Sequence, residues 1–419
     1  MVEQLVTFPL DISNVKVLAT ETNAAGDYTI TVESTLNTTR CRKCGRDISK
    51  FHGHDGEVCL RHLPILGRRV YIRIRPKRYQ CPYCSGNPTT TQVLEWYDPR
   101  SPHTRVYEEH VLLQLVNSTT QDVSRKEQVG YDAVAGVVAR WISTEVDWAS
   151  YTELGVLGID EIALKKGHRD FVAIITARLP EGRTVVLAVL KDRQKETVKA
   201  FLASIPVPLR QTIHTVCTDM WEGYINAVYE VFGQDVGGQV EVVIDRFHVA
   251  EGYHDCADNL RKQEVKRLKR ELPADAYEQI QRTMWPFRKR QAQWTLEEAE
   301  QMKRLFAHSP ALQQAYDLRE KLTAIFEQNI SKAKATRQIK AWCAEVRDSG
   351  LKCFDTFLTT LDNWLDEITN YFHHRHNSGF VEGLNNKIKV IKRRCYGILN
   401  VKHLFQRLYL DLEGYRLFA

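Results

Sequence analysis

The order of apolar segments between residues 156 and 244 is the feature that most constrains the fold of this 419-residue chain. β-Branched runs alternate there with amphipathic stretches, and the turn-forming residues 180–183 join two of the runs as a hairpin would. In chain order the expected elements are strands at 156–159, 171–176 and 184–189, a helix at 198–205, a strand at 213–218, a helix at 225–232 and a strand at 240–244. This pattern predicts an antiparallel three-stranded meander followed by two further strands with helices between them.

Acidic residues stand at the ends of two of these strands. Asp160 follows the first strand, and Asp219 follows the fourth. Three antiparallel strands, helix, strand, helix, strand is the order of the ribonuclease H-like fold, in which acids on the first and fourth strands meet a third acid on a late helix. Glu382 is the candidate third acid, because it lies beside an apolar helical stripe formed by Val381, Leu384, Ile388 and Ile391.

Carboxylates at the ends of different elements can hold two divalent cations side by side, and such a pair of ions catalyses phosphodiester chemistry. Asn386, Lys389 and Arg393 share one face of the expected helix with Glu382. A carboxylate on this face can bind a metal ion while the following turns hold a phosphate backbone. We therefore predict metal-dependent chemistry on DNA, with Lys389 and Arg393 as DNA contacts.

Three motifs give the chain a family resemblance. They are Gly-Ile-Asp-Glu at 158–161, Val-Ile-Asp-Arg-Phe-His-Val at 243–249 and Val-Glu-Gly-Leu-Asn-Asn-Lys-Ile-Lys at 381–389. With them the chain resembles, over nearly its whole length, the DDE transposases of the ISL3 class of bacterial insertion sequences. The resemblance implies a catalytic triad of the three acids, consisting of Asp160, Asp219 and Glu382.

The expected mechanism is phosphoryl transfer without a covalent enzyme intermediate. Asp160 would bridge two Mg²⁺ ions, Asp219 would hold one and Glu382 the other, with Mn²⁺ as a substitute. The expected partners are double-stranded DNA, as element ends and target, and further copies of the chain in a homodimer or higher oligomer on DNA. Two alternatives stay open: a catalytically inactive transposase-derived DNA-binding regulator, and a simple metal-dependent nuclease that cuts without joining.

Two Cys-x-x-Cys pairs mark the N-terminal part of the chain. This spacing lets two thiolates occupy adjacent corners of a tetrahedral zinc site, so the four expected ligands of a structural Zn²⁺ ion are Cys41, Cys44, Cys81 and Cys84. Between the pairs, an alternating strand at 70–75 places Arg73 and Arg75 on one face with Tyr71, and both arginines are candidate DNA contacts. Four neighbours are possible alternative ligands, although we favour an ordinary surface or core role for them: Cys59, His52, His54 and His62.

A helix-turn-helix candidate follows. Helices are expected around 111–116, 121–128 and 134–141, with the turn at Gly130 and Asp132 as a cap of the last helix. Three basic residues are expected to position phosphates: Arg125, Lys126 and Arg140. The alternative is a merely structural three-helix unit, because the small residues of the last helix offer few base-reading groups.

The long gap between Asp219 and Glu382 predicts an insertion at 251–376 with a helical and highly charged pattern. A basic segment at 261–270 and four tryptophans lie in it, the expected anchors being Trp285, Trp294, Trp342 and Trp364. The insertion is either a solvated helical scaffold or a direct DNA clamp. The resemblance favours a role in holding element ends and in dimerisation.

Several residues near the acids have open roles. Trp221 is either a core lid or a platform for an unstacked base, and His248 either supports a metal ligand or contacts phosphate. Glu161 and Asp245 are candidate auxiliary ligands. For Asp245 we favour instead a role in ordering the segment that contains His248.

Composition agrees with a multidomain α+β protein. The net charge of +6 permits DNA binding without requiring it, and no long apolar run or signal peptide is present, so we expect a cytoplasmic bacterial protein, nucleoid-associated when bound to DNA, and no membrane partner. The expected domains are a zinc-ribbon-like domain at 1–100, a helix-turn-helix domain at 101–150, a ribonuclease H-like core at 151–250 and 377–419, and an all-α insertion at 251–376.

Overall fold

The computed structural model describes residues 7–165, 169–233, 240–375 and 379–419, without the side chains at 169, 374, 379–382 and 385. The chain divides into two compact units, one formed by residues 1–143 and 406–419 and the other by residues 144–405. No helix in the described ranges combines the length and the hydropathy that crossing a membrane requires.

The first unit begins with three small sheets. A four-stranded sheet has the order β1-β2-β7-β6, a three-stranded sheet the order β5-β8-β9, and β3 pairs with β4. The strands are β1 (Val15–Thr22), β2 (Tyr28–Ser34), β3 (Thr39–Arg40), β4 (Asp47–Ile48), β5 (Lys50–His54), β6 (Val58–Ile65), β7 (Arg68–Ile74), β8 (Lys77–Gln80) and β9 (Thr89–Thr91). In β7 the apolar Val70, Ile72 and Ile74 are fully buried, whereas Tyr71 and Arg73 alternate with them on the other face, as the sequence predicts.

Three helices follow the sheets, and the last part of the C-terminal helix packs with them. They are α1 (Arg105–Leu115), α2 (Thr120–Glu127), α3 (Tyr131–Trp141) and α16 (Val401–Phe418). The Asn117 amide donates to Asp411 of α16 at 3.0 Å, and Gln406 donates to the Ile142 carbonyl at 3.0 Å. The sequence predicts Asp132 as the cap of α3, and this prediction is wrong, because Gly130 is the N-cap residue. Asp132 lies in the first turn, where its negative charge interacts favourably with the positive end of the helix.

The second unit contains a five-stranded sheet with the order β12-β11-β10-β13-β14. β10, β11 and β12 are antiparallel, whereas β13 and β14 run parallel to β10. Its elements are β10 (Gly155–Lys165), β11 (Arg169–Arg178), β12 (Thr184–Val189), α4 (Lys195–Ser204), α5 (Val207–Arg210), β13 (Ile213–Thr218), α6 (Glu222–Phe232) and β14 (Glu241–Ile244), after a 3₁₀ turn, η1 (Trp148–Ser150). The predicted hairpin turn is confirmed, with Gly182 at a φ of +86° and the Leu179 amide donating to the Arg183 carbonyl at 2.9 Å.

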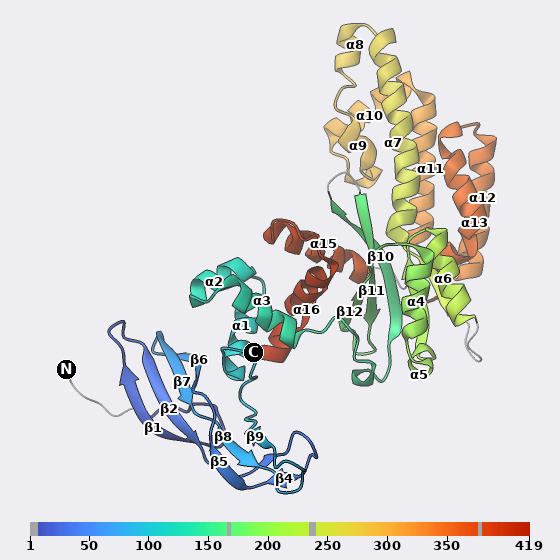
Figure 1. The fold of residues 1–419 in the computed structure, drawn as a ribbon. Helices are drawn as coiled ribbons and strands as arrows, with labels where there is room; N and C mark the ends of the chain where they lie inside the picture. The colour runs from blue at the N-terminus through green and yellow to red at the C-terminus, as the bar shows by residue number, and fades with distance from the viewer. Residues whose placement is uncertain (1–6, 166–168, 234–239, 376–378) are drawn as a thin grey trace. The chain divides into compact units, whose positions relative to one another are not determined.

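Helices cover both faces of this sheet. Figure 1 shows α4 and α6 on one side of the strands and α15 (Gly379–Arg394) on the other. Val198 and Leu202 of α4 and Ile225 and Val228 of α6 are fully buried in one core with strand residues such as Leu157. The apolar residues whose spacing predicts these two helices therefore form the face that each helix buries.

Every regular element that the structure describes between Ile244 and residue 379 is a helix, as the sequence predicts for the insertion. The helices are α7 (Arg246–Glu271), α8 (Ala274–Glu278), α9 (Met284–Arg288), η2 (Gln291–Gln293), α10 (Leu296–His308), α11 (Pro310–Glu327), α12 (Lys332–Asp348), η3 (Lys352–Phe354), α13 (Asp355–Thr369) and α14 (Tyr371–His374). Figure 1 shows α7, α11, α12 and α13 side by side as a bundle. The Asn370 side chain donates to the Val242 carbonyl of the edge strand β14 at 2.8 Å, so the insertion caps that edge of the sheet.

The insertion uses its expected aromatic anchors unequally. Trp342 is buried and donates to the Leu318 carbonyl at 2.8 Å, and Trp294 donates to the Pro286 carbonyl at 2.7 Å. Trp364 is partly buried against the same core. Trp285 is not an anchor, because 64% of it is exposed.

Candidate active site and metal centre

The strand register places Asp160 and Asp219 at the same level of the sheet. β10 and β13 are parallel neighbours, and Gly158 pairs with Cys217, so each aspartate lies two residues beyond a paired position. Backbones of adjacent strands are about 4.8 Å apart. The sequence prediction that both acids stand at strand ends is confirmed for Asp219, which directly follows β13, whereas Asp160 lies within the longer β10.

The environment of Asp219 favours a cation. Burial raises the pKa of this carboxyl to about 6, and the carboxylates of Glu161 and Asp160 add to the rise, against the opposing effects of the Trp221 amide and His248. The Trp221 amide donates to Asp219 Oδ1 at 3.1 Å. A partly desolvated carboxylate beside two others gains most from a multivalent cation, which relieves the repulsion among them.

Glu161 is held by Arg193 next to this acidic group. One guanidinium nitrogen of Arg193 lies 3.0 and 2.8 Å from the two carboxylate oxygens of Glu161. The guanidinium carbon also lies 4.6 Å from the ring centroid of Phe171 and 5.2 Å from that of Trp221. The ring of Trp221 therefore makes a cation–π contact with Arg193, and the same arginine neutralises Glu161. The sequence pattern did not identify Arg193.

Asp245 caps the helix that follows β14. Its side chain accepts from the Phe247 amide at 2.9 Å, and its own amide donates to the Thr218 carbonyl at 2.9 Å. The expectation that Asp245 orders the segment with His248 is thus confirmed. His248 Nδ1 lies 3.6 Å from Glu251 Oε2 on the next turn of α7.

Glu382 belongs to α15, but its side chain lies outside the described residues. The helix packs on β10, and the Lys392 ammonium donates to the Ala163 carbonyl. Leu384, Ile388 and Ile391 form the buried stripe that the sequence predicts. The opposite face is exposed, with three of the predicted polar residues on it: Asn386, Lys389 and Arg393.

The four cysteines of the two Cys-x-x-Cys pairs lie close together in the first unit. Their sulfur atoms all lie within 4.8 Å of one another, with 3.9 Å between Cys41 and Cys84 and 3.7 Å between Cys44 and Cys81. Sulfurs at the corners of a tetrahedral zinc site are about 3.8 Å apart, given Zn–S bonds of about 2.3 Å. Among the described residues, no other group of His, Cys, Asp and Glu side chains is gathered as closely.

The thiols are also prepared for a cation. Backbone amides of Cys44 and Lys43 lower the pKa of Cys41 to about 6, whereas contact with Cys44, together with burial, raises the pKa of Cys84 to about 12. Four crowded sulfurs therefore cannot all ionise unless a cation compensates their charge, which fits a structural zinc ion. The alternative ligands do not join them, and His62 is buried at 2.9 Å from the Thr104 hydroxyl.

The basic residues predicted to contact DNA have unequal surroundings. Arg125 and Lys126 are exposed in the last turn of α2. Arg140 is instead bound to the buried Glu108, which also accepts from Trp141 Nε1 at 2.6 Å. The two arginines of the N-terminal strand region form ion pairs, Arg73 with Glu21 and Glu57 at 3.3 and 3.6 Å, and Arg75 with Glu57 at 3.6 Å.

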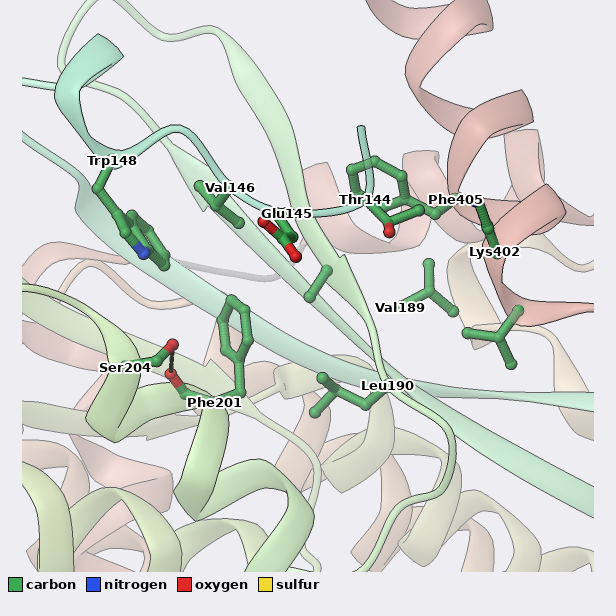
Figure 2. Close-up of a pocket in the computed structure, with 12 residues that line it drawn as sticks. Thr144, Glu145, Val146, Trp148, Val189, Leu190, Phe201, Ser204, Lys402 and Phe405 are labelled. Carbon is green, nitrogen blue, oxygen red and sulfur yellow. Dashed lines mark hydrogen bonds between the residues drawn. The ribbon is translucent and has the colours of Figure 1, made fainter. Parts of the chain in front are cut away.

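A hollow of about 540 Å³ lies beside the edge strand β12 (Figure 2). Trp148 and Phe201 line it with ring centroids 6.0 Å apart, and Glu145 and Lys402 are the charged side chains of its lining. Neither Asp160 nor Asp219 lines it. The hollow is therefore separate from the candidate active site, which lies within β10 and directly after β13.

Comparison with known proteins gives two matches to families. Residues 157–408 match the ISL3 family of DDE transposases, described as transposase. Residues 37–84 match the zinc finger of the transposases of IS204, IS1001, IS1096 and IS1165. The second match covers the four cysteines.

Individual relatives are similar in sequence to this chain over most of its length. The transposase for insertion sequence element IS1001 of Bordetella parapertussis is 28% identical over 387 residues, or 92% of this chain and 91% of the relative. The transposase for insertion sequence element IS1557 of Mycobacterium tuberculosis is 21% identical over 397 residues, or 90% and 86%. Among solved structures, a Drosophila P element transposase strand transfer complex is 10% identical, with a TM-score of 0.41 over 74% of this chain and 91% of that one.

Proposed function

Because the chain belongs to the ISL3 family of DDE transposases, we propose that it binds the terminal inverted repeats of an insertion sequence and catalyses metal-dependent DNA cleavage and strand transfer. The observation that carries this proposal is the acidic group formed by Asp160 within β10 and Asp219 directly after β13. Asp160 lies on β10 and Asp219 directly follows the adjacent parallel strand β13, and burial, with Glu161 and Asp160 adding to its effect, raises the pKa of Asp219.

We infer that the five-stranded sheet is a ribonuclease H-like core. Its order, with three antiparallel strands and then two parallel ones, supports the assignment, as do α4 and α6 at the two crossovers. In such a core the third acid is supplied by a late helix, and α15 packs on β10 from the chain region expected to supply it. The helical insertion between β14 and α15 then separates the third acid from the first two in sequence.

Asp160, Asp219 and Glu382 would hold the metal ions in this proposal. When bound, two Mg²⁺ or Mn²⁺ ions activate a water molecule or a DNA 3′-hydroxyl and stabilise the leaving oxygen. Asp160 would be shared between the ions, because its strand β10 pairs with β13 and also contacts α15. Glu161 stays with Arg193 and Asp245 stays with the start of α7, so neither is a primary ligand.

DNA would be held by basic groups that the fold leaves exposed. We infer that α2 and α3 form a helix-turn-helix, in which Arg125 and Lys126 reach phosphates. Lys389 and Arg393 on α15 would hold the backbone close to the acids. Arg140 and Arg73 are weaker candidates than their charge suggests, because carboxylates within the chain already bind them.

The test is a reaction with duplex DNA that carries the element's own ends, a target plasmid and Mg²⁺. We expect cleavage at the element ends and joined products, both absent when Mg²⁺ is omitted. Sequence-specific binding without cleavage would instead support the regulator. Cleavage without any joined product would support the simple nuclease.

A further inference from the structure

One tyrosine beside the acidic group has a hydroxyl without a partner. Tyr224 lies in α6, five residues after Asp219, and its side chain is fully buried. Its Oη has no hydrogen-bond partner among the described residues. Because a buried hydroxyl without a partner costs free energy, it needs an explanation such as a bound water molecule or an ion.

The surroundings of Tyr224 identify what is missing. Burial raises the pKa of its phenol most. The carboxylates of Asp219, Glu161 and Asp160 raise it further, against an opposing effect of Arg193. The phenol therefore remains protonated and acts as a hydrogen-bond donor toward negative charge. The ring of Trp221 packs edge-on at 4.7 Å between centroids, which fixes the direction of the phenol.

A second hydroxyl without a partner adds to this observation. Thr218 immediately precedes Asp219, is 2% exposed, and its Oγ1 likewise has no partner among the described residues. Thr218 and Tyr224 are thus two buried hydroxyl groups close to Asp219 in the sequence. A water molecule or a hydrated cation near Asp219 would give the Tyr224 hydroxyl the acceptor that it lacks.

We propose that Tyr224 is a positioning residue of the metal site, whose hydroxyl donates a hydrogen bond to a ligand of the cation held by Asp219, either a carboxylate oxygen or a bound water molecule. This inference rests on the proposed function, because it needs a cation at Asp219. Tyr224 itself touches neither the cation nor DNA. Its contribution is to fix the orientation of a ligand and so to raise the affinity for the cation.

The experiment compares Tyr224→Phe with wild type in the zinc-loaded full-length protein without DNA. Mn²⁺ affinity is measured by electron paramagnetic resonance, and stability by denaturant unfolding with and without Mn²⁺. We expect Mn²⁺ affinity to fall about 10-fold, while stability without Mn²⁺ is unchanged or higher. An unchanged Mn²⁺ affinity, or a loss of stability in the absence of Mn²⁺, would overturn the proposal.

Tyr253→Phe is the matched control. Tyr253 is also buried, but its hydroxyl lies 3.0 Å from the Thr323 hydroxyl within the insertion. This variant should lose stability without Mn²⁺ and keep its Mn²⁺ affinity, the reverse of Tyr224→Phe.

Asp219→Asn separates this inference from the proposed function. If Asp219→Asn loses Mn²⁺ binding while Tyr224→Phe keeps it, the role of Tyr224 is wrong and the metal site stands. If the wild-type protein binds no Mn²⁺ beyond its zinc site, both are wrong.

Discussion

Two aspartates of the second unit show how local partners decide the state of a carboxyl. Burial raises the pKa of Asp219, and among the described residues the Trp221 amide and the charge of His248 offset this rise only in part. Burial alone would also raise the pKa of Asp258, but hydrogen bonds from Arg288 and Arg261 outweigh it and hold that pKa well below its usual range. Asp258 is therefore a structural ion-pair centre, whereas we propose that Asp219 binds an external cation.

Asp258→Asn should destabilise the second unit by about 3 kcal/mol, because Arg261, Arg288 and Lys262 lose the buried carboxylate that they share and Arg261 itself stays buried. Asp258 is 3% exposed and lies 2.7 Å from Arg261 and 2.8 Å from Arg288. Denaturant unfolding gives the change. Asp362→Asn, which breaks an exposed ion pair with Arg347, is the control and should change stability little. Equal effects of the two substitutions would contradict this assignment.

The ion pairs of Asp258 also predict how the stability of the protein depends on pH. In the unfolded chain an aspartate ionises near pH ~3.9. The lowered pKa of Asp258 in the folded protein means that folding favours the ionised form, so this contribution to stability is complete above that range and is lost as the pH falls below it. The stability difference between wild type and Asp258→Asn should therefore shrink when the pH is lowered from about 6 to about 3. A difference that does not change with pH would refute the ionic origin.

At the scale of elements, the zinc ribbon is a small core held by its metal. Beside the cysteines, its buried apolar residues are few, with Ile48 and Tyr79 packed against them. Such a core supplies little folding energy of its own, so the binding energy of the metal substitutes for it.

Replacing Cys41 and Cys81 by serine should therefore remove the bound zinc, weaken DNA binding and leave the second unit folded. Zinc is measured by elemental analysis, and the unfolding of the second unit by its own cooperative transition. Cys59→Ser, an exposed cysteine on β6, is the control and should keep one zinc per chain. Full zinc content in the double variant would show that the ligands are elsewhere.

Helix α2 gives a prediction about DNA affinity. Arg125→Ala combined with Lys126→Ala removes two exposed charges without removing a partner from a buried group. Because each phosphate contact releases about one counterion, we expect weaker binding to end DNA and a salt dependence lower by about two ions. Fluorescence anisotropy at several salt concentrations measures both. An unchanged salt dependence would show that α2 does not face DNA.

At the scale of the whole chain, the features that were predictable from the sequence are local ones. The five strands of the second unit and the four zinc ligands follow from residue spacing, which fixes local geometry before any tertiary contact forms. The ion pair of Arg193 with Glu161 did not follow, because Arg193 lies in a loop and only the folded sheet brings it to β10. For the same reason, charge alone suggested Arg140 as a DNA contact, although the buried Glu108 binds it.

The orphan hydroxyl of Tyr224 was equally hidden from the sequence. A tyrosine on the apolar face of a helix has the pattern of an ordinary core residue. Only the packing of α6 next to β13 shows that its hydroxyl lies in the field of three carboxylates without a hydrogen-bond partner.

The central claim is that three carboxylates, Asp160, Asp219 and Glu382, hold the ions that drive transposition. The most direct measurement is the rate of cleavage and joining at the element ends for Asp160→Ala, Asp219→Ala and Glu382→Gln. Each should abolish both reactions and leave binding to end DNA nearly intact, because each removes a ligand used in the transition state rather than a DNA contact. Glu161→Gln and Asp245→Asn are the matched controls and should be milder, since Glu161 is held by Arg193 and Asp245 by the start of α7. Cleavage by Glu382→Gln at the wild-type rate would contradict the claim and place the third ligand elsewhere in the chain.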